Sequence, residues 1–227
     1  MKIKPLLAAA VAVILLTAHA DIIASGRSAN PDSASQFRFR GYIGGMMLHS
    51  GYIQSNGFRI YGSSGADLGI MRIKGGATGI GGHVKFAFGT ATDMIRIGAE
   101  GHSSNVSYRP SPSYSHIGWG GLLVDYIRRT KGHVHPFAGI IIGGGGVKNH
   151  IIAEGSVHDY TVETSAAMHK YAFMAVAPFA GIEVSLTRKL SLVIKADWLL
   201  NATGCQEDFP SGLRIYAGIL FNRLQNR

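Results

Sequence analysis

Charged side chains stand at alternate positions in otherwise apolar segments of this 227-residue chain, and they are the residues with the clearest chemistry. In segment 190–200, Lys195 and Asp197 alternate with Ile194 and Ala196. Because successive side chains of a strand point to opposite faces, one face of such a strand is apolar and the other carries charge. Five basic and four acidic residues share this second face along the chain: Arg40, Lys85, Arg96, Glu100, Asp125, Glu183, Lys195, Asp197 and Arg214.

Charges that face one enclosed space must pair, because an unpaired charge out of bulk water is costly. The near balance of sign therefore predicts a salt-bridged polar core. Such a core serves either as a plug that holds the strands in register or as the gate of a narrow conduction path. Position along the strands separates two groups: Arg40, Lys85, Arg96, Asp125 and Glu183 toward one end, and Glu100, Lys195, Asp197 and Arg214 toward the other.

Other motifs with a recognisable chemistry are weaker. The glycine run 143–146 lacks the Lys-Ser/Thr pair and the following helix of a phosphate loop, so a bend or close packing in a strand is expected. His133 and His135 have no nearby third ligand for a metal ion. Histidines of the segment 148–172 could bind metal or titrate in mild acid, but no metal site is predicted there: His150, His158 and His169.

A lipid-modifying enzyme would need a Ser-His-acid set on the outer wall. His102 and Ser103 are neighbours in the sequence, and Glu100 is close. The alternation nevertheless turns His102 to the charged, inward face, away from lipid. We therefore predict no catalytic residue and no cofactor, and keep the enzyme only as an alternative.

The first 20 residues have the features of a secretory signal peptide. They combine a charged start, an apolar run at 6–16 and the small residues Ala18 and Ala20, which predicts cleavage after Ala20. The apolar run is shorter than the roughly 20 residues of a membrane helix, although an uncleaved anchor is the alternative. The single cysteine, Cys205, excludes an internal disulfide and is expected as a free thiol in the last external loop.

The composition favours a chain in contact with lipid. Charged residues make up 15% of the sequence, against about 25% in an average soluble protein. The longest apolar window beyond the signal, 171–186, contains Pro178 and Glu183, so it is a poor membrane helix. Closed barrels are the other backbone that satisfies its hydrogen bonds in a bilayer.

Eight segments have the alternation and length of a tilted membrane strand: 37–48, 78–88, 94–102, 117–127, 135–147, 173–186, 190–200 and 213–221. The long connections, expected outside the cell, are 49–77, 103–116, 148–172 and 201–212, and the short ones are 89–93, 128–134 and 187–189. This alternation of long and short is typical of outer-membrane barrels, and the even number of strands places both chain termini on the periplasmic side. The predicted organisation is a signal peptide at 1–20, a periplasmic segment at 21–36, a barrel at 37–222 and a tail at 223–227.

A soluble barrel such as a lipocalin has the same period with the faces reversed. Its wetted face should be rich in Lys, Glu, Thr and Asp. Here the second face carries only one to three charges per strand, and much of the rest is Gly, Ser, Tyr or Ala. The membrane barrel is therefore the favoured interpretation.

Two hairpin motifs resemble a known group of proteins. Segment 121–126 (GLLVDY) is followed by 136–143 (PFAGIIIG), and 179–187 (FAGIEVSLT) is followed by 190–192 (LSL). They resemble small outer-membrane barrels of the opacity-protein and OmpA/OmpW-like type over roughly 117–221. Such barrels usually end in an aromatic residue, whereas six residues follow Phe221 here.

The resemblance and the alternation together predict an all-β fold, an eight-stranded antiparallel up-and-down transmembrane β-barrel of a bacterial outer membrane. The predicted role is non-enzymatic, structural or adhesin-like, with a host or extracellular ligand bound through loops 49–77 and 148–172. A narrow OmpW-like channel is the first alternative and a lipid-modifying enzyme the second. Expected partners are outer-membrane lipid, including anionic headgroups near the loops, and the barrel assembly machinery. Nucleic acid is not expected, because no basic cluster is interleaved with aromatic residues.

Overall fold

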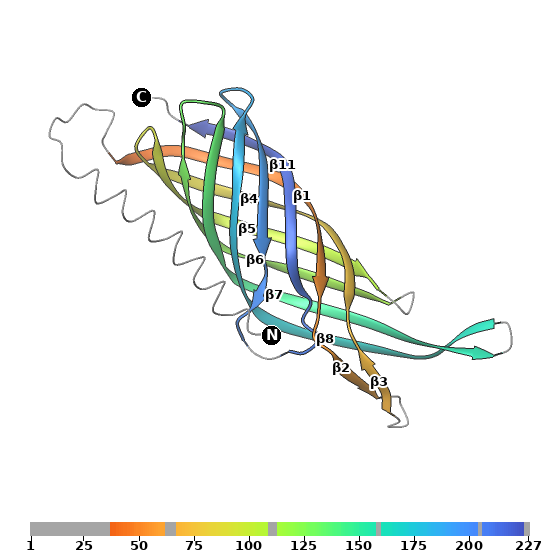
Figure 1. The fold of residues 1–227 in the computed structure, drawn as a ribbon. Helices are drawn as coiled ribbons and strands as arrows, with labels where there is room; N and C mark the ends of the chain where they lie inside the picture. The colour runs from red at the N-terminus through yellow and green to blue at the C-terminus, as the bar shows by residue number, and fades with distance from the viewer. Residues whose placement is uncertain (1–36, 62–66, 109–112, 158–159, 204–205, 225–227) are drawn as a thin grey trace.

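The computed structural model describes residues 37–61, 67–108, 113–157, 160–203 and 206–224 (Figure 1). The predicted signal peptide, the segment 21–36, His158 and Cys205 lie outside these residues. No helix in the described residues is long and apolar enough to cross a membrane.

Eight long strands form the wall of the molecule. They are β1 (Arg38–Gln54), β4 (Lys74–Gly89), β5 (Asp93–Ser107), β6 (Tyr114–Arg128), β7 (Val134–Val157), β8 (Tyr160–Ser185), β9 (Leu190–Trp198) and β11 (Ser211–Leu224). Three short strands complete the set: β2 (Phe58–Tyr61) and β3 (Asp67–Met71) form a separate hairpin, and β10 (Leu200–Asn201) pairs with β8.

The wall closes into a ring. Each long strand pairs antiparallel with the next, and β1 pairs with β11, for example Leu48 opposite Ala217. The order around the ring is β8-β7-β6-β5-β4-β1-β11-β9, with β9 returning to β8. The predicted eight-stranded antiparallel up-and-down barrel is confirmed.

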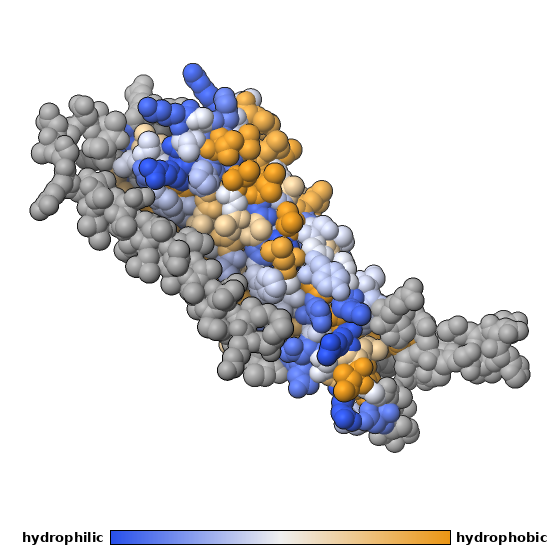
Figure 2. All heavy atoms as spheres, in the orientation of Figure 1, coloured by the Kyte–Doolittle hydropathy of each residue, from blue (hydrophilic) through white to orange (hydrophobic). Residues whose placement is uncertain are grey.

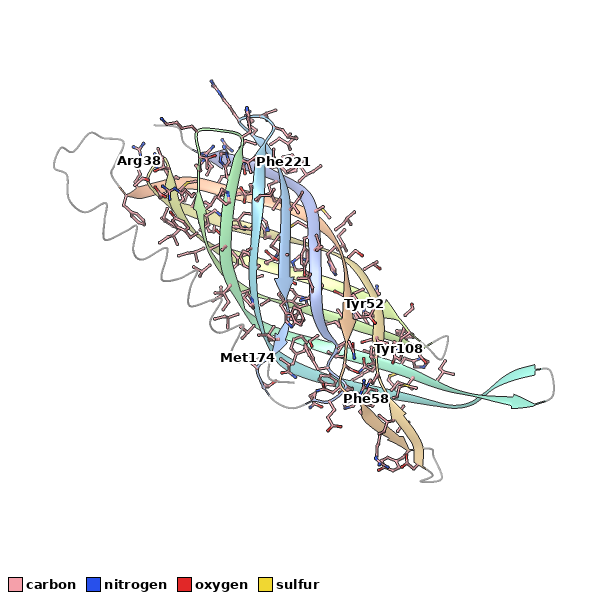
Figure 3. All side chains as sticks on the ribbon, viewed as in Figure 1. Arg38, Tyr52, Phe58, Tyr108, Met174 and Phe221 are labelled. Carbon is pink, nitrogen blue, oxygen red and sulfur yellow. The ribbon has the colours of Figure 1, made fainter. Side chains whose placement is uncertain are left out.

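The two ends of the barrel differ in their connections. Short turns join β4 to β5, β6 to β7 and β8 to β9 at one end, the turn end, where β1 begins and β11 finishes. At the other end, the loop end, β2/β3 and the β7/β8 hairpin project beyond the wall (Figure 1). Arg38 and Phe221 lie toward the turn end, and Phe58 and Tyr108 lie at the loop end (Figure 3).

Several strands are longer than the alternation predicts. β7 and β8 have 24 and 26 residues, so most of the predicted loop 148–172 is a paired extension of the wall, and β1 runs on to Gln54. Backbone pairing needs no apolar face outside the bilayer, so the apolar pattern stops before the ladder does. β11 also continues to Leu224, which places the first two residues of the predicted tail in the barrel.

The side chains face as the alternation predicts. In β9, Ile194 is 50% exposed on the outside, whereas Lys195 is 1% exposed on the inside. The outer wall as a whole is apolar and exposed: Ile80, Val84, Phe86, Ile95, Ile97, Leu122, Val124, Ile142, Ile182, Leu192, Ile215 and Ile219. Figure 2 shows apolar side chains gathered on the wall, with hydrophilic ones concentrated toward both ends.

A bulge at the start of β1 sets the facing of Arg40. Phe39 is opposite Phe88, but the next paired residue is Gly41, opposite Ala87. Both Arg40 and Gly41 are therefore buried. Gly41 has φ = 132°, and a Cβ there would lie 2.1 Å from the carbonyl oxygen of Arg223, so only glycine fits.

Candidate functional site

The lumen near the turn end holds a cluster of four charges, here called the turn-side cluster: Lys85, Arg96, Asp125 and Glu183. Arg96 bridges two carboxylates. Its Nε and Nη2 donate to Asp125 at 2.6 and 3.0 Å, and its Nη1 donates to Glu183 Oε1 at 2.5 Å. Lys85 Nζ donates to Asp125 Oδ2 at 2.8 Å. Two cations and two anions balance, and the Phe137 ring lies 5.3 Å from Lys85 Nζ.

A second group, the loop-side cluster, surrounds Glu100. Lys195 forms an ion pair with its carboxylate. His102 Nε2 lies 2.5 Å from Oε1, and His83 Nδ1 lies 3.4 Å from Oε2. Lys195 Nζ also lies 4.5 Å from the centre of the Tyr216 ring, a cation–π contact.

Arg214 and Asp197 complete the loop-side cluster on neighbouring strands. Arg214 Nε donates to Asp197 Oδ1 at 3.0 Å, and its guanidinium lies 5.1 Å from the Trp119 ring. Arg40, the remaining predicted charge, lies at the turn end, where its Nε donates to the carbonyl of Gly89 at 2.9 Å. The contacts thus follow the two groups that position along the strands predicts.

Two of the ion pairs cross the lumen. β5 and β9 lie on opposite sides of the ring, so the pair of Glu100 with Lys195 connects facing walls. The pair of Arg96 with Glu183 joins β5 to β8, three strands away around the ring. All four side chains are at most 5% exposed. The geometry therefore fills the interior with mutually neutralised charge and ties the wall strands to one another.

The lumen also holds polar and aromatic residues around His102, of which sequence reasoning missed His49 and Ser104. His49 Nε2 lies 2.7 Å from Ser104 Oγ, and the His49 ring lies 4.8 Å from that of Tyr216. The His102 ring lies 5.1 Å from Trp119. His49 and Ser104 fall just past the predicted ends of their strands, at 48 and 102. Extending the same alternation by two residues would have found them.

At the loop end, residues 208–210 are buried, and Asp208 and Phe209 contact side chains of β7 and β8. Asp208, 5% exposed, accepts hydrogen bonds of 2.7 Å from Asn149 Nδ2 and His169 Nδ1. Phe209 packs against Phe173 with ring centres 4.9 Å apart. Part of the predicted external loop 201–212 therefore folds inward. Burial raises the pKa of the Tyr108 hydroxyl, and the Asp208 carboxylate adds to the effect.

Outside the barrel, a second small core joins three loops. Ile73, Tyr108 and Ile151 are buried together, after β3, after β5 and in the β7 extension. Partly buried residues of the β2/β3 hairpin pack against them: Phe58, Ile60 and Met71. Ser55 Oγ accepts from the Ile73 amide at 2.9 Å. These residues define what we call the external platform.

The other motifs do not form sites in the described residues. His102 is buried in the lumen, whereas Ser103 faces outward, so the two do not make a dyad on the outer wall. No group of three or more His, Cys, Asp or Glu residues is arranged for a metal in the part of the chain that the structure describes. His135 instead lies 3.1 Å from Ser185 Oγ. The glycine run 143–146 lies within β7, as predicted.

The closed ring, the apolar exposed wall and the charged interior define a membrane-spanning β-barrel. A soluble barrel would bury its apolar face and expose the charged one, which is the reverse of what is observed. The fold that the resemblance predicts is the fold observed.

The sequence matches no protein-family model and no curated protein. Among solved structures, it is similar to Neisserial surface protein A, with a TM-score of 0.49 and 10% identity, over 82% of this chain and 99% of that one. It is also similar to Ail, the attachment invasion locus protein of Yersinia pestis, in complex with the heparin analogue sucrose octasulfate (TM-score 0.46, 8% identity, 80% and 98% covered). A third is the N-terminal β-barrel domain of Pseudomonas aeruginosa OprF, with a TM-score of 0.41 and 13% identity, over 82% of this chain and 100% of that one. The assignment of the fold rests on the strand order and register above.

Proposed function

We propose that this chain is an outer-membrane barrel with a closed lumen, and that its function is surface contact through the external platform. The observation that carries the proposal is the set of ion pairs across the lumen. Glu100 with Lys195 joins facing walls, and Asp208 is buried at the loop end, where Asn149 of β7 donates to it. A filled lumen leaves the structures beyond the bilayer as the part able to meet a partner.

The platform has the properties of a contact surface. It is held by its own small core, so its hairpins are positioned before binding, which lowers the entropic cost of association. On its outside, Tyr61 is 60% exposed and Ile70 is 68% exposed. Exposed aromatic and aliphatic side chains on a fixed scaffold are typical of protein interaction sites. A host or extracellular ligand held through segments 49–77 and 148–172 is the partner we propose.

The topology is tested by trypsin treatment of intact expressing cells. We expect cleavage at loop-end sites such as Arg59 and Arg72, and protection of turn-end sites such as Arg129 and Lys189 until the cells are broken. Each cleavage site is identified by mass spectrometry of the fragments. Cleavage at Lys189 in intact cells would overturn the orientation.

Contact is tested by replacing the β2/β3 hairpin with a short Gly-Ser turn. We expect expressing cells to lose binding to surfaces coated with extracellular-matrix proteins, while the barrel keeps its heat-modifiable migration on gels. As a control, the turn between β8 and β9 is replaced in the same way and should leave binding unchanged. Unchanged binding without the hairpin would remove the platform from the proposed role.

The closed lumen predicts that the folded protein gives no steady conductance in planar bilayers. Replacing both Glu100 and Lys195 with alanine removes the brace between β5 and β9 and should produce resolvable current steps. The paired change of Glu100 to Gln and Lys195 to Met keeps the side-chain volume, so this variant should give no current steps. Steady conductance of the unmodified chain would instead support the narrow channel.

A further inference from the structure

A row of basic side chains crosses three neighbouring strands on the outside of the wall. His116 of β6 is opposite Lys148 of β7, and Lys148 is opposite Lys170 of β8. We call these three residues the cationic row. Their parity is that of the lipid-facing side chains, because Leu122 and Ile142 on the same strands face outward.

The row marks the outer limit of the apolar wall. Moving from the turn end along β7, the outward positions 138–146 are Ala, Ile, Ile, Gly and Gly, and Lys148 is the next. The ten residue steps from Ala138 to Lys148, along a strand tilted by about 40°, rise about 25 Å, the usual height of the lipid-facing band. The cationic row therefore lies at the level of the lipid headgroups in the loop-side leaflet.

Directly below the row, the wall is hollowed. An open hollow of about 490 Å³ is lined by the cationic row together with Gly118, Gly146, Val147, Tyr171 and Ala172. Gly118 and Gly146 are paired and face outward. A Cβ on Gly118 would meet nothing within 4 Å, and one on Gly146 would meet only the Tyr171 carbonyl oxygen, at 3.7 Å. The missing side chains leave an apolar trough that opens to the lipid.

The charges of the row are not neutralised by the protein in the described residues. Neither Lys148 nor Lys170 forms an ion pair there, and like charges directly opposite each other destabilise a sheet. Asn105 Oδ1 lies 2.7 Å from His116 Nδ1 and holds that ring at the end of the row. An anion between these side chains would convert a repulsive arrangement into a favourable one.

We propose that the cationic row and the trough form a binding site for one phosphate-bearing lipid of the loop-side leaflet. The phosphate lies against His116, Lys148 and Lys170, and an acyl chain lies over Gly118 and Gly146. A free phosphate or an acidic protein would use the row but not the trough, so the combination favours a lipid. The inference rests on the proposed membrane orientation but not on the platform's contact role.

The experiment is native mass spectrometry of the full chain released from phosphatidylcholine nanodiscs that contain graded amounts of phosphatidic acid. We expect saturable retention of one phosphatidic acid per chain. Each lysine beside an anionic headgroup contributes about a factor of five. The double variant K148Q/K170Q should therefore bind about 25-fold more weakly, while K148R/K170R keeps its affinity.

Two controls separate the lipid from other occupants. The variant K74Q/K189Q removes two exposed lysines away from the row and should bind as the unmodified chain does. Gly118→Leu fills the trough and should weaken the binding of phosphatidic acid. Inorganic phosphate should displace phosphatidic acid poorly from all variants. Equal retention by K148Q/K170Q, or full competition by inorganic phosphate with no effect of Gly118→Leu, would overturn the lipid site. Heat-modifiable migration verifies that each variant is folded, and binding to matrix-coated surfaces reports separately on the platform.

Discussion

Replacing Arg96 with Met is expected to lower the free energy of unfolding by about 3–5 kcal/mol, because the change leaves buried carboxylates without their cation. Arg96 is fully buried and donates to both Asp125 and Glu183. After the change, only Lys85 remains near two negative charges. The measurement is urea unfolding in phospholipid vesicles, followed by tryptophan fluorescence, with heat-modifiable migration as the test of folding.

The chain offers a matched control for this change. Arg59 lies 2.5 Å from Asp67, the same distance as Arg96 from Glu183, but the Arg59 side chain is 60% exposed. Water and salt screen the exposed pair, so Arg59→Met should cost about 0–1 kcal/mol. The loss of unfolding free energy for Arg96→Lys should lie between those of Arg59→Met and Arg96→Met, because one ammonium does not reproduce the forked contact with two carboxylates. Equal losses for Arg59→Met and Arg96→Met would show that the lumen pairs do not hold the barrel together.

The side to which each wall residue points was predictable from the sequence, because the lipid side requires apolar residues and the lumen accepts charged ones at alternate positions. In β9, Ile194 and Lys195 differ by one position and end on opposite sides, as period two requires. The same rule placed eight of the nine charges in the lumen, whereas Arg40 faces inward because of the bulge before Gly41. His49 and Ser104 follow the same alternation, but they lie one or two residues past the predicted strand ends, so the prediction missed them.

The individual ion pairs within the lumen were less predictable from the sequence. Position along a strand indicates height, and it separated the turn-side from the loop-side cluster. The pairing of Glu100 with Lys195 also depends on how far each strand is staggered around the ring, which a single sequence does not contain. The inward fold of Asp208 and Phe209 depends on contacts with β7 and β8 side chains. A loop carries no periodic signal for such contacts.

Glycines of the wall have two different roles, which a pair of substitutions separates. Gly81 faces the lumen opposite His102, and a Cβ there would lie 1.8 Å from His102 Nδ1 and 2.4 Å from the Gly101 carbonyl oxygen. The His102 ring does not have room to move away. Its centre is 4.7 Å from that of Tyr216, and Glu100 holds its Nε2 at 2.5 Å.

Gly81→Ala is therefore expected to destabilise the barrel by about 3 kcal/mol, since added volume in a filled interior forces neighbouring groups apart. Gly118→Ala makes the same chemical change on the lipid-facing side, where a Cβ would meet nothing within 4 Å, and should stay within about 0.5 kcal/mol. Both values come from urea unfolding in vesicles. If the two variants unfold at the same urea concentration, the loop-side lumen is loosely packed, and the argument for a closed interior loses its support. If only Gly81→Ala unfolds early, the side chains around His102 fill the lumen as tightly as the distances indicate, and the barrel is closed by packing as well as by charge.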